Sequence, residues 1–213
     1  MTKAGAFISF EGGDGAGKST QIMRLADRLR AAGHEVVVTR EPGGSDGAEA
    51  IRTLLVRGDT DRWSPLAEAL LMFAARADHM EKTIRPAITR GAIVITDRFA
   101  DSTMAYQGLA GEFGVDNVKI LHGLVVGDNG PDLTIILDMP AEEGLRRATS
   151  NGGETRFEEK GAAFQARVRE AFLQIARENY ARCVVVDASG TIEEVGANVS
   201  AAVKIKLPGL LPT

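Results

Sequence analysis

The chain has 213 residues, of which 44% are hydrophobic and 25% are charged, a composition typical of one soluble globular domain. Its formal net charge of −4 argues against a general affinity for nucleic acid or for a membrane surface. The single cysteine excludes an intrachain disulfide bond, and no apolar segment suits a signal peptide or a membrane-spanning helix, so we expect a cytoplasmic enzyme.

Short apolar runs rich in β-branched residues alternate with longer segments of helical periodicity. This alternation predicts one three-layer α/β/α domain spanning 1–213, with a five-stranded parallel sheet between the helices. Strands are expected at Ala6–Phe10, Glu35–Thr39, Ile93–Thr96, Leu133–Leu137 and Cys183–Val186. Helices are expected near Ser19–Ala32, Ser64–Thr89, Asp116–Gly127, Ala141–Ala148, Glu158–Ala181 and Ile192–Val203. Loops are expected at Arg40–Gly47 and Thr149–Thr155, and the Pro/Gly-containing tail 207–213 is expected to be frayed.

A phosphate-binding pattern, G-x-x-x-x-G-K-[ST], follows the first predicted strand and opens the first predicted helix. Glycines let backbone N–H groups turn toward phosphate oxygens, and the helix N-terminus favours negative charge. In such a loop Lys18 reaches the β- and γ-phosphates, and the Ser19 hydroxyl binds Mg²⁺. The pattern therefore predicts an ATP site. Its residues are Gly12, Gly13, Asp14, Gly15, Ala16, Gly17, Lys18, Ser19 and Thr20.

Two further strands end in charged residues. Asp97 and Arg98 follow Ile93–Thr96, at the carboxyl end of a strand, where ligands bind in open α/β sheets. Asp97 is a candidate Mg²⁺ ligand, and Arg98 can grip a phosphate as a fork. Asp138 is a rival carboxylate at the end of Leu133–Leu137, although it can instead cap the helix that follows.

Four motifs together resemble the bacterial thymidylate kinases: the phosphate-binding loop, Thr39–Gly44, Leu70–Arg76 and Asp97–Phe99. The resemblance runs from about Phe7 to Val195, with the motifs in the family's order. It implies a P-loop kinase fold with a mobile lid, ATP and Mg²⁺ as the phosphoryl donor, and dTMP as the acceptor.

The same resemblance assigns side chains to the acceptor. It implies a stack of Phe73 on thymine, although an aromatic residue on an apolar helix is more often part of the core. It also implies that one arginine donates to a base carbonyl and that two others hold the acceptor phosphate. The implied dTMP-binding residues are Asp14, Arg40, Phe73, Arg76, Arg98, Thr103, Tyr106 and Gln107.

A further positive charge is expected at the transferring phosphoryl group, since such an arginine accelerates phosphoryl transfer. Some thymidylate kinases carry it in the phosphate-binding loop, at the position that is Gly15 here, and others carry it in a lid. The sequence resembles the second type, with a lid at about 146–157. Arg156 is the first candidate and Arg147 the second, and Lys18 and Arg98 complete the predicted catalytic set.

Two other functions stay open at this point. A deoxynucleoside kinase would need a carboxylate beside the sugar 5′-hydroxyl, and a regulatory P-loop ATPase would hydrolyse ATP without an acceptor. Family resemblance also suggests a homodimer that uses the apolar helix Ser64–Ala77.

Overall fold

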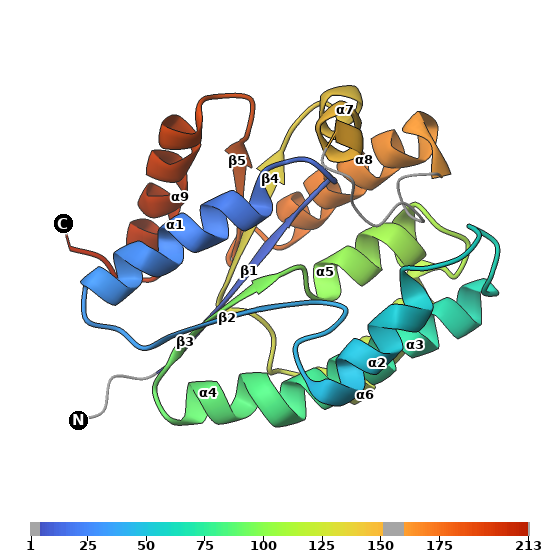
Figure 1. The fold of residues 1–213 in the computed structure, drawn as a ribbon, viewed down its shortest axis with the longest axis horizontal. Coiled ribbons are helices and arrows are strands. Elements are labelled where there is room, and N and C mark those ends of the chain that lie inside the picture. The colour runs from blue at the N-terminus through green and yellow to red at the C-terminus, as the bar shows by residue number, and fades with distance from the viewer. Residues whose placement is uncertain (1–4, 151–159, 213) are drawn as a thin grey trace.

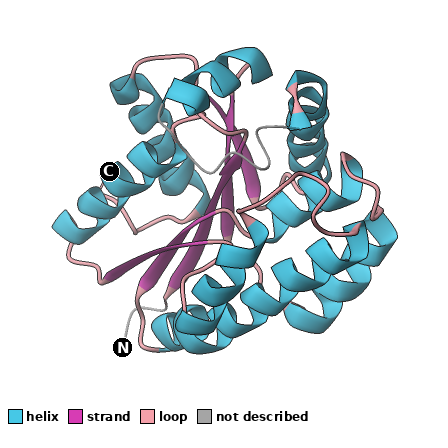
Figure 2. Ribbon diagram, turned by 45° about the vertical axis from the view of Figure 1, so that its right-hand side comes forward, coloured by secondary structure: helices cyan, strands magenta, loops and turns pink. Residues whose placement is uncertain are grey.

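The computed structural model describes residues 5–150 and 160–212. One sheet of five parallel strands, ordered β2-β3-β1-β4-β5, lies between helices on both sides (Figure 2). The strands are β1 (Ala6–Gly12), β2 (Val36–Arg40), β3 (Ile93–Asp97), β4 (Leu133–Asp138) and β5 (Cys183–Asp187). Every predicted strand is present, and the predicted α/β/α fold is confirmed.

The helices form two unequal layers (Figure 1). One face of the sheet carries α1 (Lys18–Ala31) and α9 (Ile192–Lys206), which pack side by side. The helices on the other side are α2 (Asp46–Leu55), α3 (Pro65–His79), α4 (Arg85–Thr89), α5 (Ala100–Thr103), α6 (Val115–Val125) and α8 (Ala162–Glu178). Two π-helical segments, η1 (Met80–Ile84) and η2 (Met104–Leu109), extend α3 and α5, and α7 (Ala141–Ser150) packs on α8.

The central strand β1 explains how the core and the site share one sheet. Its alternate residues Ile8 and Phe10 pack into the apolar core beneath α1 and α9. Phe7 points to the opposite face and packs with η1 and α4. Ser9 and Glu11 share that second face, where they are fully buried polar side chains. The sheet therefore has one apolar face and one face that becomes polar toward the carboxyl ends of its strands.

Three helical elements were not predicted: α2, α5 and η2. The helix α2 begins at the end of the predicted loop Arg40–Gly47, and it buries Ala48 and Leu55. The short α5 and η2 replace what the sequence suggested only as a polar binding segment after Asp97-Arg98.

The C-terminal tail differs from the prediction of a frayed extension. Leu207 and Leu210 pack against the core beneath α1 and α9, and Leu211 is buried within it. The His34 ring also lies 2.9 Å from the carbonyl oxygen of Leu210. Burial of these leucines outweighs the effect of the neighbouring Pro and Gly residues. Among the residues that the structure describes, no helix is both long and apolar enough to span a membrane.

Candidate active site

The phosphate-binding loop connects β1 to α1. Gly12 has a φ of 125°, and a Cβ there would collide with the carbonyl oxygen of Leu137 on β4. Gly17 precedes α1 in the left-handed conformation, and no side chain of the described residues caps this helix. The first-turn N–H groups of α1 are thus left for an anionic ligand. Gly15 also has a positive φ of 75°, which disfavours an arginine at that place.

Lys18 and Ser19 lie at the start of α1, beside the ends of two strands. The Lys18 ammonium donates to the carbonyl oxygens of Gly12 at 3.2 Å and Gly13 at 2.9 Å. Burial, followed by the nearby Arg98, lowers the pKa of Lys18. The Ser19 hydroxyl donates to Asp97 Oδ2 at 3.0 Å, so the two predicted metal ligands are in contact.

Arg98 connects the phosphate-binding loop to the neighbouring pocket. Its Nη1 donates to Gly12 O and to Ser102 Oγ, both at 3.0 Å, and its Nη2 donates to Asp14 Oδ1 at 2.6 Å and to Tyr106 Oη at 3.3 Å. Its φ of 66° is unusual for a residue with a side chain, and such strain is common at functional sites. Burial alone would raise the pKa of Asp14, but the Arg98 and Lys18 charges outweigh burial and lower it. Both Asp14 and Arg98 therefore stay charged.

A pocket of about 720 Å³, counting its open mouth, adjoins the loop and has the size of a small-ligand site. Its walls come from the phosphate-binding loop, the segment after β2, α2, α3 and the α5–η2 segment. The lining residues are Asp14, Glu41, Pro42, Arg52, Val56, Met72, Arg76, Arg98, Phe99, Ser102, Thr103, Tyr106 and Gln107. Five of these were predicted to bind dTMP in addition to Arg98: Asp14, Arg76, Thr103, Tyr106 and Gln107.

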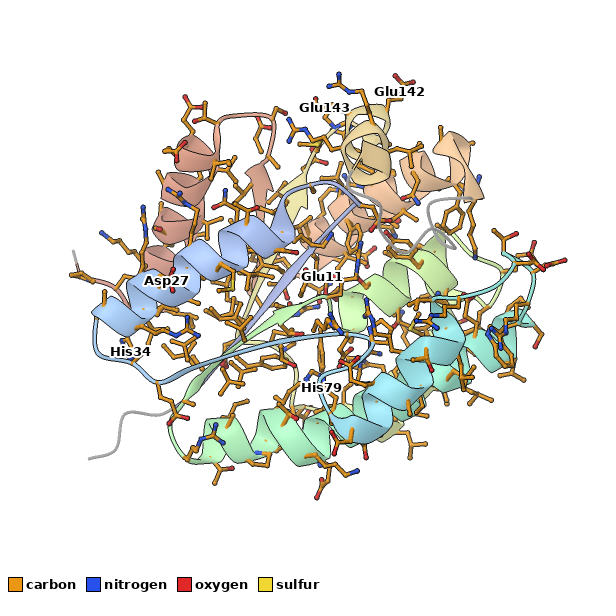
Figure 3. All side chains as sticks on the ribbon, in the orientation of Figure 1. Glu11, Asp27, His34, His79, Glu142 and Glu143 are labelled. Carbon is orange, nitrogen blue, oxygen red and sulfur yellow. The ribbon has the colours of Figure 1, made fainter. Side chains whose placement is uncertain are left out.

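Arg76 crosses the floor of this pocket from α3. Its Nε donates to Glu41 Oε2 at 2.8 Å, and its Nη2 donates to Thr103 Oγ1 at 3.0 Å. The other Glu41 oxygen lies 3.0 Å from Nδ1 of the buried His79, which Figure 3 places beside α2. Arg76 Nη1 is buried without a hydrogen-bond partner among the described residues. A donor left in this way is suited to an acceptor atom of a ligand.

Gln107 and Tyr106 line the pocket from η2. Gln107 Nε2 donates to Glu68 Oε1 at 2.9 Å, and both side chains are buried. The Tyr106 hydroxyl lies 3.4 Å from Asp14 Oδ2, and its ring packs near Phe164 and Phe172 of α8. The pocket thus has one charged end at the phosphate-binding loop and one amide-lined end.

The stacking of Phe73 on the base stays a prediction. Phe73 is 2% exposed and does not line the pocket, and the Arg76 guanidinium covers its ring at 4.9 Å. The preceding residue, Met72, lines the pocket instead. Met72 and Arg76 are four residues apart, so they share a helix face, a spacing that the sequence contained.

Arg40, also predicted to bind dTMP, lies outside the pocket. Its guanidinium donates to Glu49 Oε2 at 3.1 Å and is 55% exposed. Arg40 instead lines an adjoining cleft that also contains Ser19 and Asp97. It therefore faces the predicted metal site rather than the base end of the pocket.

Several pocket residues were missed because the elements that carry them were missed. Arg52 and Val56 come from α2 and the residue after it, and Arg52 Nη1 donates to Pro42 O at 2.5 Å. The Glu49–Arg52 spacing on a short helix opened by Ser45-Asp46 was the available signal.

The predicted lid arginines are only partly described. Arg147, on α7, donates to Glu143 Oε1 at 2.5 Å, one turn away, while Arg156 lies outside the described residues. Gly144 of α7 approaches the carbonyl oxygen of Asp14 so closely that a Cβ would clash with it. The rival carboxylate Asp138 is held by two hydrogen bonds from Arg169, at 2.7 and 2.8 Å. Because both of its oxygens accept hydrogen bonds from Arg169, Asp138 is a weaker candidate than Asp97 for a metal ion beside Ser19.

A phosphate-binding loop at a strand end, next to a pocket that ends in charged side chains, defines a P-loop kinase. A family model described as "Thymidylate kinase" matches residues 10–199. The chain belongs to the thymidylate kinase family, which confirms the predicted class of enzyme.

Individual relatives are also thymidylate kinases. The chain is 60% identical over 203 residues to a thymidylate kinase of Caulobacter vibrioides, covering 95% of this chain and 98% of that one. It is 54% identical to that of Dinoroseobacter shibae, covering 94% and 97%. The crystal structure of thymidylate kinase from Ehrlichia chaffeensis superposes with a TM-score of 0.77 at 35% identity, covering 94% of this chain and 99% of that chain.

Proposed function

We propose that this enzyme transfers the γ-phosphoryl group of ATP to dTMP bound in the pocket beside the phosphate-binding loop. A phosphate oxygen of dTMP forms the new bond to the γ-phosphorus as the bond to the bridging oxygen of ADP breaks. No strong general base is needed, because a phosphate monoester is already anionic near neutral pH. Lys18 and Arg98 neutralise the charge that develops between the two nucleotides. We expect the reaction to occur in the cytoplasm, where both nucleotides are available.

The pocket walls divide the recognition of dTMP among three kinds of contact. Arg98 sits at the charged end, where it can hold the acceptor phosphate as a fork. Arg76 Nη1 and the Gln107 amide are placed for the polar edge of the base. Asp14 and Tyr106, whose side chains lie 3.4 Å apart, are expected to face the deoxyribose. Arg40, from the adjoining cleft, supplies a second positive charge toward the transferring group.

The residues around Ser19 fit a Mg²⁺ ion. Ser19 Oγ and Asp97 Oδ2 are hard oxygen donors 3.0 Å apart at the foot of the phosphate-binding loop. Among the described residues, no group of three or more His, Cys, Asp or Glu side chains could hold a metal ion. A protein site with so few ligands suits Mg²⁺, which keeps waters and phosphate oxygens as its other ligands. When bound, the ion would neutralise phosphate charge and orient the phosphoryl oxygens.

We also propose that a lid arginine adds a further positive charge beside the transferring phosphoryl group. We keep Arg156 as the first candidate and Arg147 as the second, since Gly15 brings no charge to the loop. Arg156→Ala should lower kcat by at least about a hundredfold while changing the Kd of dTMP much less. A loss confined to dTMP binding would remove Arg156 from the catalytic set.

The observation that carries the proposal is the set of bonds made by Arg98. One guanidinium joins the phosphate-binding loop, at Gly12 and Asp14, to the pocket wall, at Ser102 and Tyr106. ADP release should therefore require an acceptor phosphate. A coupled assay with ATP–Mg²⁺ should give ADP with dTMP, and little with thymidine or without acceptor. Activity on thymidine alone would indicate a nucleoside kinase, and equal release without acceptor would indicate an ATPase.

We also propose that the enzyme is a homodimer through α3 and α6. These neighbouring helices expose Leu66 and Leu70 on α3 and Ile120 and Leu124 on α6, each at least 47% accessible. A cluster of exposed leucine and isoleucine side chains is typical of a protein interface. Light scattering should give twice the chain mass of 22.6 kDa. Leu124→Glu should give the single-chain mass, whereas the same change at Ile205, exposed on α9, should not.

A further inference from the structure

Glu68 is a buried carboxylate that the mechanism does not use. It lies on the first turn of α3, is 5% exposed, and accepts from Gln107 Nε2 at 2.9 Å. The Lys160 ammonium lies 4.0 Å from the same oxygen, so the buried charge has an opposite charge nearby. Burying a carboxylate is costly, and its position behind a pocket residue calls for an explanation.

The pairing fixes one end of a side chain that otherwise has two equivalent orientations. A glutamine amide carries a donor group and an acceptor group, and it can present either to a ligand after a half-turn. A carboxylate only accepts hydrogen bonds, so it holds the NH₂ group of Gln107. The carbonyl oxygen Oε1 is then the end of the amide that remains for the pocket, which Gln107 lines.

Arg76 offers the complementary group. Its Nη1 is buried without a partner among the described residues, and Arg76 lines the same pocket. The base end of the pocket thus presents one donor, Arg76 Nη1, and one acceptor, Gln107 Oε1. A pyrimidine with a 4-oxo group and a 3-NH group, such as thymine, matches this order. Cytosine, with a 4-amino group and an unprotonated N3, presents the reverse order.

We propose that Glu68 is a positioning residue for base selection, which locks the Gln107 amide so that the pocket accepts 4-oxo pyrimidine nucleotides and rejects 4-amino ones. This inference rests on the proposed function, because it takes the pocket to be the acceptor site. Glu68 does not touch the nucleotide itself. Glu41 plays the corresponding part for Arg76, whose Nε it holds at 2.8 Å.

The variant Glu68→Gln tests the lock, because glutamine can donate as well as accept and so permits the flipped Gln107 amide. Calorimetry would give the Kd of dTMP and of dCMP for the parent and variant enzymes. The ratio of the dCMP Kd to the dTMP Kd should fall by about tenfold to a hundredfold, the usual effect of one mismatched buried hydrogen bond. Arg76 still opposes the 4-amino group, so some preference for dTMP should remain. The matched control is Glu193→Gln on α9, an exposed glutamate on the other face of the sheet, which should leave the ratio unchanged.

If Glu68 has a purely structural role, Glu68→Gln would raise the Kd of dTMP and the Kd of dCMP by the same factor. The ratio of the two Kd values would then stay unchanged, which would overturn the proposal. Gln107→Leu distinguishes a failure of the proposed acceptor site from a failure of the role of Glu68. It should lower the ratio of the dCMP Kd to the dTMP Kd if the pocket is the acceptor site, whatever Glu68 does. If Glu68→Gln fails to fold, NMR of the side-chain amide of Gln107 in the parent enzyme tests the proposal instead. The Gln107 NH₂ resonances, assigned by their loss in Gln107→Leu, should stay protected from exchange when dTMP binds, and loss of protection would refute the lock.

Discussion

The two halves of the active site are built by different means. The half proposed to bind ATP is a single run of backbone, Gly12–Ser19, in which Gly12, Gly15 and Gly17 have positive φ angles and a Cβ at Gly12 would collide with Leu137 O. The dTMP half is assembled from side chains on five separate segments and is held by buried carboxylates behind arginines and amides. The first half depends on local geometry, and the second depends on tertiary pairing. Mutations should therefore act differently in the two halves.

The sharpest test of the ATP half is Lys18→Met. Removing the Lys18 ammonium from the loop should lower kcat by about a thousandfold, as for loss of a main transition-state donor. Stability should hold or rise, because burial lowers the pKa of Lys18 and so its charged form is held at a cost. Steady-state kinetics and thermal unfolding would measure the two effects. A large fall in the unfolding midpoint would mean that this half, too, depends on side-chain pairing.

The next test compares the two arginines predicted to hold the acceptor phosphate. Arg98→Lys keeps the charge but cannot bridge Gly12, Ser102 and Asp14 at once, so kcat/KM for dTMP should fall by about a hundredfold. Arg40→Lys should cost less than about tenfold, because Arg40 is 55% exposed and its pair with Glu49 is screened by water. Equal losses would place both arginines in the acceptor half.

A pH effect on stability should come from the buried carboxylate Glu11, which Figure 3 places near the centre of the molecule. Burial, and next the neighbouring Asp101, raise its pKa from 4.5 to about 7. The folded protein then keeps this proton up to about pH 7, whereas the unfolded chain releases it near pH 4.5. Rising pH through this window should lower the free energy of unfolding by up to about 3 kcal/mol.

Glu11→Gln isolates that contribution, because it cannot titrate. Its side chain can still accept from Phe99 N–H, which the Glu11 carboxyl does at 2.8 Å. Urea unfolding at pH 5, 6, 7 and 8 should show a steeper loss of stability in the parent than in the variant. Parallel curves would show that Glu11 does not bind a proton in this range.

The sequence predicted the place of the phosphate-binding loop between β1 and α1, because a loop motif between a strand and a helix is local in the chain. All five strands followed from short apolar patterns, and the structure brings Ser19 and Asp97, two residues named from their motifs, into contact. The acceptor half was predicted only where family resemblance supplied the residues. The helix α2, which carries Arg52, was not predicted, although Ser45 and Asp46 at its start are typical of a helix N-terminus. The carboxylates behind the site, Glu41 and Glu68, come from elements whose contacts no local pattern contains.

The smallest effects should come from Met72 and Phe73, neighbours on α3 that the structure assigns to different environments. Met72→Ala should raise the KM for dTMP several-fold, since it removes apolar surface that lines the pocket, and should change stability little. Phe73→Leu should leave this KM within about twofold but cost about 1 kcal/mol of stability, because a side chain 2% exposed loses packing. KM measurements and chemical unfolding on both variants would decide. If Phe73→Leu raised KM as much as Met72→Ala with no loss of stability, Phe73 would act in the acceptor half, and the predicted stacking on the base would be supported.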